Sequence, residues 1–361
     1  MHGKLRMSRH AVSALIAAGA LAALPLVLGA TADAAPAGSS GAGAPPAQVC
    51  GFKNNPPQQY KHVIWVWMEN QPYTNIIGSP TSPYVNSLAQ QCGLATNYHN
   101  ITHPSAPEYL AATSGELGGA GDCTPSQCPD SNDNIFNEAD LHGVSWKTYS
   151  GGEASVQNDT SLAPQYRTPT CAQGDPGSGY NPPYDVNHNP PVYYTDINPQ
   201  LLDPSAPPGP CQLDDVDAGT PLYGNFASDL ASNRLPAFSF IGPDLCSDTH
   251  DCPIYNGDNY LQDLIGTIVS SNEYQSGQTV LFLVWDEGEG GTSTDCAFNT
   301  TDVGCHVAAV VVSPSTRPGT QSDVLFNHYS LLKTTEQLLN LPLLGHSADP
   351  DINSMIGAFN L

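Results

Sequence analysis

Short, continuous runs of apolar residues mark the strands that this sequence predicts. The runs are Val63–Met68, Ala237–Ile241, Thr279–Trp285 and His306–Ser313. Runs of this length, rich in valine and aromatic side chains, are typical of strands that are buried on both faces of a sheet. Three further segments have the pattern of helices: Glu108–Ser114, Tyr260–Ser270 and Tyr329–Leu339.

The order of these elements predicts the fold class. Because strands alternate with helices, we expect an α/β sandwich around a mostly parallel sheet. The stretch from about 150 to 225 differs, because it is rich in Pro, Gly, Asn, Asp and Tyr. We interpret it as a loop-rich insertion that covers one edge of the sheet, and not as a separate domain.

The start of the chain has the layout of a secretory signal. Basic residues within 1–9 precede an apolar run, Val12–Ala30, and the small-residue segment Ala32–Ala34 follows. We therefore predict a signal peptide at 1–34 and a flexible leader at 35–48. A membrane anchor is the alternative, but the run is rich in Ala and Gly and only just long enough to span, so we expect no stable membrane anchor.

All ten cysteines follow residue 48. An even number of cysteines behind an export signal predicts disulfides and a secreted, extracellular protein. Without a C-x-x-C pair, a zinc ribbon or redox dithiol is disfavoured. Sequence does not determine connectivity, and pairing of neighbours is our working hypothesis: Cys50–Cys92, Cys123–Cys128, Cys171–Cys211, Cys246–Cys252 and Cys296–Cys305.

The charge balance limits the partners. The 361 residues hold 10 Lys plus Arg against 34 Asp plus Glu, a formal net charge of −24. Such acidity argues against nucleic acid and against anionic lipid surfaces, because both attract basic clusters. It does not exclude a phosphorylated substrate, since a bound metal reverses the local field.

Oxygen ligands follow the predicted strands at the point where each strand ends. Glu69 and Asn70 follow the first run, Asp286 and Glu287 follow the third, and an acidic segment containing His250 follows Ala237–Ile241. Ligands in open α/β sheets bind beyond the carboxyl ends of strands. Each residue alone could be a cap or a turn, but carboxylates and an amide brought together favour a hard divalent cation.

Ser105 lies between two prolines, just before a predicted helix. At a helix N-terminus, free N–H groups and the dipole favour an anion and a deprotonated hydroxyl. The alternative is that Ser105 merely caps the helix.

Histidines are candidate acids, bases or ligands, although most single histidines are exposed or capping residues; the candidates are His188, His250, His306 and His328. The absence of G-x-S-x-G, H-E-x-x-H and P-loop motifs disfavours the corresponding hydrolases and nucleotide enzymes.

Several segments, taken in order, resemble one family over residues 58–345. They are His62–Asn70, Pro104–Leu110, Leu235–Asp244, Val284–Gly288 and His328–Glu336. The pattern is similar to that of the secreted bacterial phosphoesterase family, which contains acid phosphatases and phospholipase C enzymes within the alkaline phosphatase superfamily. The resemblance implies a three-layer αβα sandwich, alkaline-phosphatase-like, in which 49–361 form a single phosphoesterase domain.

The resemblance also implies roles for individual residues. Ser105 would be the nucleophile and form a phosphoserine intermediate. One divalent metal ion would be held by the Ser105 hydroxyl and four other side chains: Glu69, Asn70, Asp286 and Glu287. His188 and His250 would contact the phosphate or protonate the leaving group. His103 and Asp251 are further candidates for substrate binding, and His306 is a weaker one.

Two departures from the family pattern qualify this assignment. Glu108 stands where the family usually has Asn, and its carboxylate could weaken anion binding or could point away on the helix. The pair Asp286-Glu287 replaces the Asp-His pair frequent in the superfamily, so we expect one metal ion and not two zinc ions. Oxygen-rich ligation favours Ca, Mg or Mn over Zn.

The leading hypothesis is a secreted, metal-dependent phosphoesterase that hydrolyses phosphate monoesters, like an acid phosphatase. The alternative within the same fold is a phospholipase C acting on phospholipid headgroups, for which a tyrosine-rich cage could bind choline; its candidate residues are Tyr180, Tyr184, Tyr193 and Tyr194. A non-catalytic secreted binding module is a third hypothesis. The partner in the first two is a small phosphorylated substrate or a phospholipid headgroup, and we make no prediction of oligomeric state.

Overall fold

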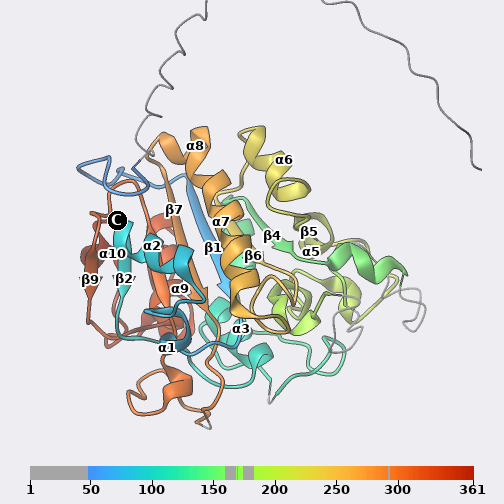
Figure 1. The fold of residues 1–361 in the computed structure, drawn as a ribbon. Helices are drawn as coiled ribbons and strands as arrows, with labels where there is room; N and C mark the ends of the chain where they lie inside the picture. The colour runs from blue at the N-terminus through green and yellow to red at the C-terminus, as the bar shows by residue number, and fades with distance from the viewer. Residues whose placement is uncertain (1–47, 120, 159–167, 169, 174–182, 292) are drawn as a thin grey trace, which may run out of the picture. The chain divides into compact units, whose positions relative to one another are not determined.

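The central sheet has β1 in its middle, flanked by β6 and β7 (Figure 1). This computed structural model describes residues 48–119, 121–158, 168, 170–173, 183–291 and 293–361. Within them the strand order is β5-β4-β6-β1-β7-β8-β2-β9. The strands of this sheet are β1 (His62–Met68), β2 (Gly93–Ala95), β4 (Trp146–Ser150), β5 (Asp215–Asp217), β6 (Phe238–Gly242), β7 (Thr279–Trp285), β8 (Ala309–Val312) and β9 (Thr320–Ser322).

The sheet is mostly parallel, as predicted. Only β8, among the pairs described, runs antiparallel to its neighbours β7 and β2. Met68 is paired with Trp285, so β1 and β7 end at the same level of the sheet. The short strands β3 (Tyr98–His99) and β10 (Phe326–Asn327) form a separate parallel pair.

Helices cover both faces of the sheet, which confirms the three-layer αβα sandwich. On one face, the indole N–H of Trp65 in β1 donates a hydrogen bond to the Thr335 hydroxyl of α9, and Trp67 packs on Tyr109 of α3. The other face carries α7, which packs against α2. The helices are α1 (Tyr73–Ile76), α2 (Pro83–Gln91), α3 (Ser105–Ser114), α4 (Ile135–His142), α5 (Pro210–Asp214), α6 (Asn225–Ala231), α7 (Ile254–Ser270), α8 (Asn272–Gln275), α9 (His328–Leu339) and α10 (Ile356–Phe359).

The segment from about 150 to 225 contributes to the sheet as well as to loops. Its described part contains β5, the edge strand beside β4, together with α5. Much of the rest is in short 3-10 helices, which are η1 (Glu153–Asn158), η3 (Val186–His188), η4 (Pro190–Val192) and η5 (Pro199–Leu201). Two more 3-10 helices lie later in the chain, η6 (Val303–Cys305) and η7 (Gly345–Ala348).

Two predicted boundaries differ from the structure. The strand expected at His306–Ser313 is shorter, because His306 forms only an isolated bridge with His99 before β8 begins at Ala309. The helix expected from Glu108 begins at Ser105, because proline is tolerated in the first turn of a helix.

The ten cysteines form the five neighbour pairs of the working hypothesis. Residues 47–361 form one compact unit. The predicted signal peptide at 1–34 and nearly all of the predicted leader at 35–48 lie outside the described residues. Among the helices described, none has both the length and the apolarity needed to cross a membrane.

Candidate active site

Ser105 lies between the carboxylates that follow the two central strands. Its hydroxyl donates to Asp286 Oδ2 at 3.0 Å and to Glu69 Oε2 at 3.3 Å. The ends of β1 and β7 are tied together, because the Asp286 N–H donates to Met68 O at 2.8 Å and the Asn70 N–H donates to Asp286 Oδ1 at 2.9 Å. Glu69 and Asp286, which were expected to meet at the strand ends, therefore lie beside one another, and Ser105, expected at a helix N-terminus, contacts both.

Ser105 is the first residue of α3, and the helix orients its hydroxyl. Four residues later on the same helix face, Tyr109 donates its phenolic hydroxyl to Glu69 Oε1. The Tyr109 ring stacks on His188 with ring centroids 5.5 Å apart. Sequence reasoning missed Tyr109 as a site residue, although its spacing of four from Ser105 was a usable signal.

His188 is buried between two carboxylates of the site. Its Nε2 is 3.4 Å from Glu69 Oε2, and its Nδ1 is 3.5 Å from Asp248 Oδ2. Burial alone would lower the pKa of His188, but the negative charges of Asp185, Asp248 and Asp286 outweigh it and raise the pKa to about 9. His188 therefore carries a positive charge at neutral pH. Asp248 is a second site residue that the sequence reasoning did not single out.

His250 lies at the more exposed side of the site. Its ring is 5.6 Å from the ring of His188, and its Nδ1 is 2.7 Å from Asp251 Oδ1. The backbone N–H of His250 donates to Asp248 at 2.7 Å, so the turn that carries His250 also holds Asp248 in place. His250 thus lies next to His188, and Asp251 is exposed and contacts His250.

His103 and Glu287 pair with each other. His103 Nδ1 is 2.8 Å from Glu287 Oε2. Burial raises the pKa of Glu287 to about 7, although the contact with His103 lowers it. Burial alone would lower the pKa of His103, but Glu287 outweighs this effect and raises it. In this arrangement the predicted ligand Glu287 contacts the predicted substrate-binding residue His103.

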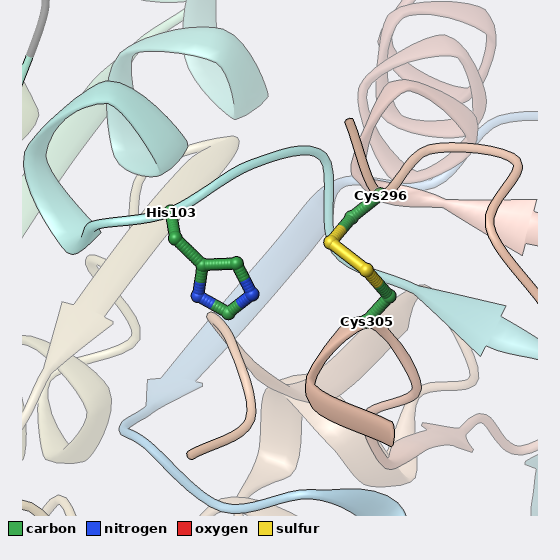
Figure 2. A group of neighbouring side chains, drawn as sticks. All are labelled: His103, Cys296 and Cys305. Carbon is green, nitrogen blue, oxygen red and sulfur yellow. A yellow bond between two sulfur atoms is a disulfide. The ribbon is translucent and has the colours of Figure 1, made fainter. Parts of the chain in front are cut away.

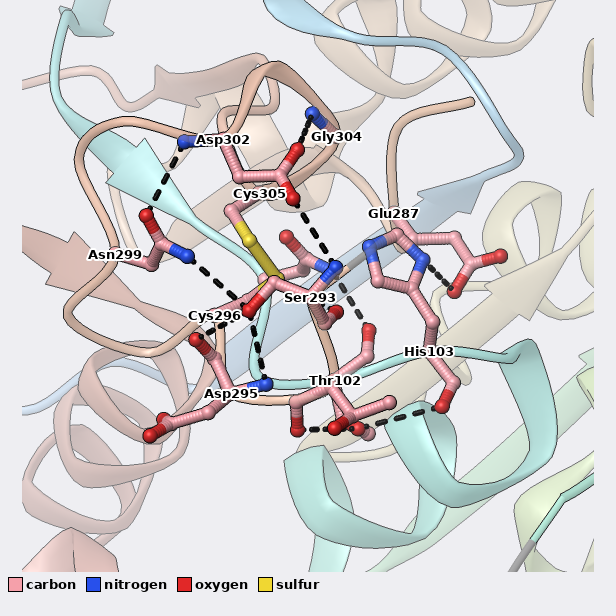
Figure 3. The surroundings of a disulfide bond; sticks show 12 residues. Thr102, His103, Glu287, Ser293, Asp295, Cys296, Asn299, Asp302, Gly304 and Cys305 are labelled. Carbon is pink, nitrogen blue, oxygen red and sulfur yellow. Dashed lines mark hydrogen bonds and ion pairs between the residues drawn. A yellow bond between two sulfur atoms is a disulfide. The ribbon is translucent and has the colours of Figure 1, made fainter. Parts of the chain in front are cut away.

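The other side of the His103 ring lies beside the disulfide Cys296–Cys305 (Figure 2). A ring nitrogen of His103 is within 4.8 Å of both sulfur atoms, but sulfurs joined in a disulfide are not free to bind a metal. Thr102 and His103 lie beside the loop that carries this disulfide (Figure 3). The loop is also bound to the segment before Ser105, because Thr102 Oγ1 donates a hydrogen bond to Thr294 O at 3.0 Å. The disulfide therefore lies against His103 and is not a metal site.

Glu108, the residue that departs from the family pattern, points away from Ser105. Its fully buried carboxylate accepts the backbone N–H of Ile101 at 2.9 Å and also accepts that of Thr102. It lies 3.3 Å from His328 Nε2, and the same nitrogen is 2.9 Å from Asp286 O. Glu108 therefore anchors the segment before Ser105, and its carboxylate is taken up by contacts with this segment and with His328.

Two other groups of predicted residues lie outside this arrangement. His306 stacks on Tyr73 and His99 and has no described contact with Ser105, Glu69 or Asp286. Tyr184, Tyr193 and Tyr194 are buried and hydrogen-bonded within the fold, so they cannot form an open cage around a choline group. Tyr180, the fourth predicted member of that cage, lies outside the described residues.

The donor set around Ser105 fits a hard divalent cation. Burial raises the pKa of Glu69 well above its usual range, and the negative charges of Asp286 and Asp248 raise it further. Carboxylates that repel one another in this way are relieved by a bound cation. The donors nearest Ser105 are all oxygen atoms, which suits Ca, Mg or Mn better than Zn.

Residues 78–342 match the sequence pattern of the Phosphoesterase family. A probable acid phosphatase of Kluyveromyces lactis is 26% identical over 302 residues, which are 82% of this chain and 62% of the yeast protein. The phosphatidylinositol-3-phosphatase of Mycobacterium tuberculosis is 28% identical over 299 residues, which are 82% of this chain and 83% of the mycobacterial protein. The chain thus spans only about three fifths of the length of its yeast relative.

A solved structure has the same fold. It is a Vibrio parahaemolyticus protein of the alkaline phosphatase superfamily, with a TM-score of 0.51 and 10% sequence identity. The alignment covers 85% of this chain and 75% of that protein. At this identity the likeness concerns the fold alone, and it agrees with the αβα architecture described above.

Proposed function

Because the chain belongs to the phosphoesterase family, we propose that it is a hydrolase that cleaves phosphate monoesters with Ser105 as its nucleophile. One observation carries the proposal: the Ser105 hydroxyl donates to both strand-end carboxylates, Asp286 and Glu69. A hydroxyl bound to carboxylates at a helix N-terminus can lose its proton to them and attack phosphorus. The acid phosphatase relative supports monoesters as the substrate class.

The residues of the site have complementary roles in this reaction. As the bond between Ser105 Oγ and phosphorus forms, the bond from phosphorus to the leaving oxygen breaks, and the serine proton passes to a neighbouring carboxylate. His250 lies on the more exposed side and gives a proton to the leaving oxygen. Water then attacks phosphorus and gives a proton to His250, the bond between phosphorus and Ser105 Oγ breaks, and Ser105 takes back its proton from the carboxylate as phosphate leaves. The positively charged His188 offsets negative charge on the phosphoryl group.

We propose that the site binds one divalent metal ion of the Ca, Mg or Mn type. Ser105, Glu69 and Asp286 would hold it, and Asn70 and Glu287 are the remaining predicted ligands. When bound, such an ion polarises a phosphoryl oxygen and favours the ionised form of a coordinated hydroxyl. Metal analysis of the purified protein, before and after chelation, measures its identity and number.

Two features support extracellular function. The start of the chain has the pattern of a signal peptide, and the described part of the chain holds five disulfides, which persist in oxidising compartments. We place cleavage after residue 34. Sequencing the N-terminus of protein recovered from culture medium tests this, and an intact Met1 in that protein would contradict it.

Hydrolysis of p-nitrophenyl phosphate across pH tests the function directly, with Ca, Mg, Mn or Zn supplied. We expect the wild type to release phosphate, and we expect Ser105→Ala to lose at least about 1,000-fold of the hydrolytic activity. Ser270→Ala is the matched control, because Ser270 is an exposed serine in α7. Absence of turnover with every metal, or a Ser105→Ala variant as active as Ser270→Ala, would refute the proposal.

A lipid-linked monoester is the natural second substrate to assay, because the mycobacterial relative is a phosphatidylinositol-3-phosphatase. Comparing phosphatidylinositol 3-phosphate with phosphatidylcholine separates a monoesterase from a phospholipase C. Because the described tyrosines do not form an open cage, we expect phosphate release from the first lipid and no choline phosphate release from the second.

A further inference from the structure

A carboxylate that the mechanism does not use lies at the N-terminus of the nucleophile helix. Asp122 Oδ1 accepts the backbone N–H of Ala106, the residue after Ser105, at 3.1 Å. Sequence reasoning gave no sign of this contact, because Asp122 belongs to a loop without a recognisable pattern. The contact brings a negative charge to the end of α3 where the proposed reaction would place a phosphoryl group.

The loop that carries Asp122 is held by several contacts. The next residue, Cys123, forms a disulfide with Cys128. The Tyr193 hydroxyl donates to Cys123 O at 2.7 Å, and the Cys123 N–H donates to Asn187 Oδ1 at 3.3 Å. Asn187 is the neighbour of His188, so the loop is tied to the segment that supplies the histidine of the site. Asp122 is therefore positioned by the fold, although the residue is exposed.

The first turn of α3 has few N–H groups to offer an anion. Pro107 has no N–H, and the N–H of Glu108 donates to Pro104 O at 3.4 Å. The first turn therefore leaves the N–H groups of Ser105 and Ala106 for a phosphoryl oxygen. Because Asp122 accepts one of these two, a phosphoryl group that uses the helix N-terminus must compete with it.

The charges around Asp122 make this competition sensitive to the charge of the substrate. Desolvation is the largest effect on the pKa of Asp122 and raises it. The nearby negative charges of Asp185 and Asp286 raise this pKa further, while His188 lowers it. Among the described residues, the ion pairs at the site involve only histidines, and Lys147 and Arg234 pair with the remote Asp229. Asp122, Asp185 and Asp286 therefore resist each additional negative charge on a substrate, and the positive groups that oppose them are His188 and the proposed metal ion, with no lysine or arginine described beside them.

We propose that Asp122 is a specificity-determining residue, an internal anion that competes with the substrate for the N-terminus of α3. By this competition it disfavours phosphoryl groups with two negative charges relative to those with one. The favoured class is then a phosphoester with a singly charged phosphoryl group, such as a monoester below its second pKa, which is about 6. The inference rests on the proposed function, because it assumes that the phosphoryl group binds beside Ser105.

Replacing Asp122 with asparagine tests the inference, because Asp122→Asn keeps an oxygen acceptor and removes the charge. The measurements are KM and kcat for p-nitrophenyl phosphate and for bis-p-nitrophenyl phosphate, and the inhibition constant of inorganic phosphate, all at pH 7.5 with the metal supplied. For Asp122→Asn we expect KM of the monoester and the inhibition constant to fall about tenfold, as for loss of one nearby repulsive charge. KM of the singly charged diester falls less.

Asp203→Asn is the matched control, because Asp203 is another exposed aspartate that accepts a backbone N–H, that of Ser205 at 2.9 Å. It should leave all constants at their wild-type values. Asp122→Ala is the second variant. If the charge and not the asparagine amide is responsible, the inhibition constant of inorganic phosphate should fall in Asp122→Ala as it does in Asp122→Asn. The inference would be overturned by an unchanged inhibition constant of inorganic phosphate in both variants, or by a fall in kcat with KM unchanged.

Failure of this inference can be distinguished from failure of the proposed function. If the wild type turns over no ester, the proposed function fails. Binding of inorganic phosphate, measured by calorimetry on the metal-loaded wild type, Asp122→Asn and Asp203→Asn, then still tests the competition. Tighter binding in Asp122→Asn alone supports the role of Asp122, and equal binding in all three proteins contradicts it.

Discussion

At the scale of single residues, the departure at Glu108 explains how the nucleophile is positioned. A carboxylate at this position would repel a phosphate if it faced Ser105. Instead it accepts the N–H groups of Ile101 and Thr102 and contacts His328, which in turn contacts the backbone of Asp286. One buried side chain thus connects the segment before Ser105 with the end of β7.

This arrangement predicts a large effect of removing the Glu108 side chain. Glu108→Ala leaves two buried N–H groups without an acceptor, which costs roughly 2–6 kcal/mol of unfolding free energy at about 1–3 kcal/mol each. Glu108→Gln keeps one acceptor oxygen and should lose less unfolding free energy than Glu108→Ala. Denaturant unfolding measures both, with Glu116→Ala as the exposed control. A loss in Glu108→Ala as small as in Glu116→Ala would show that the carboxylate does not anchor this segment.

The site residues that the sequence predicted share a local signal. Glu69 and Asp286 directly follow apolar runs, and Ser105 lies between prolines before a helix. Asp248 belongs to the acidic segment after Ala237–Ile241, but nothing in that segment distinguishes it from the neighbouring aspartates. Asp122 has no local signal, because its contact comes from a loop whose path depends on the whole fold. Direct inspection of spacing could have found Tyr109, but the burial that makes it a partner of Glu69 is a property of tertiary structure.

At the scale of secondary-structure elements, α9 supports the site through its first turn. The Asn327 side chain caps the helix by accepting the Ser330 N–H at 3.0 Å, and it donates to Ala297 O at 3.0 Å. The next residue, His328, contacts Asp286 O. The position of this cap therefore affects the strand end that carries Asp286.

Loss of this cap should affect both stability and activity. Asn327→Ala is expected to cost about 0.5–2 kcal/mol of unfolding free energy, the usual effect of losing an N-cap. It should also lower kcat, because His328 and the Asp286 backbone shift together. Ser271→Ala removes the cap of α8, where Ser271 accepts the Tyr274 N–H, and so controls for a cap without a link to the site. Equal kcat in the two variants would argue against the link through α9.

Strands were more predictable than connections at this scale. The buried apolar runs located β1, β6 and β7 to within a residue, because a strand covered on both faces needs a continuous apolar run. The reversed direction of β8 and the edge strand β5 within the insertion had no such signal. Both depend on pairing partners far away in sequence, which apolar pattern alone does not specify.

At the scale of the whole molecule, buried carboxyl groups should make the protein more stable in acid. Burial raises the pKa of Glu336 to about 8, although hydrogen bonds from Ser347 and Leu344 lower it. The folded state therefore keeps this carboxyl protonated up to about pH 8, while the unfolded chain ionises it above about pH 4.3. Between these values the folded state binds more protons, so stability falls as pH rises.

Glu336→Gln tests this dependence. The variant keeps one acceptor oxygen and cannot ionise, so its melting temperature should fall by less between pH 5 and pH 8 than that of the wild type, by a few degrees. Glu116→Gln removes an exposed carboxyl and should retain the wild-type dependence. His188 contributes in the same direction, since its raised pKa gives stability that is lost as pH rises through about 9. Identical slopes in Glu336→Gln and the wild type would contradict the expected role of burial.

The most direct test of the whole account is to look for the phosphoryl group on the nucleophile. The metal-loaded protein is mixed with p-nitrophenyl phosphate, quenched in acid within milliseconds to seconds, digested and analysed by mass spectrometry. We predict one phosphoryl group on Ser105 in the wild type and none in Ser105→Ala. Rapid turnover with the peptide that contains Ser105 unmodified at every quench time, or with the phosphoryl group on another residue, would contradict the central role of Ser105.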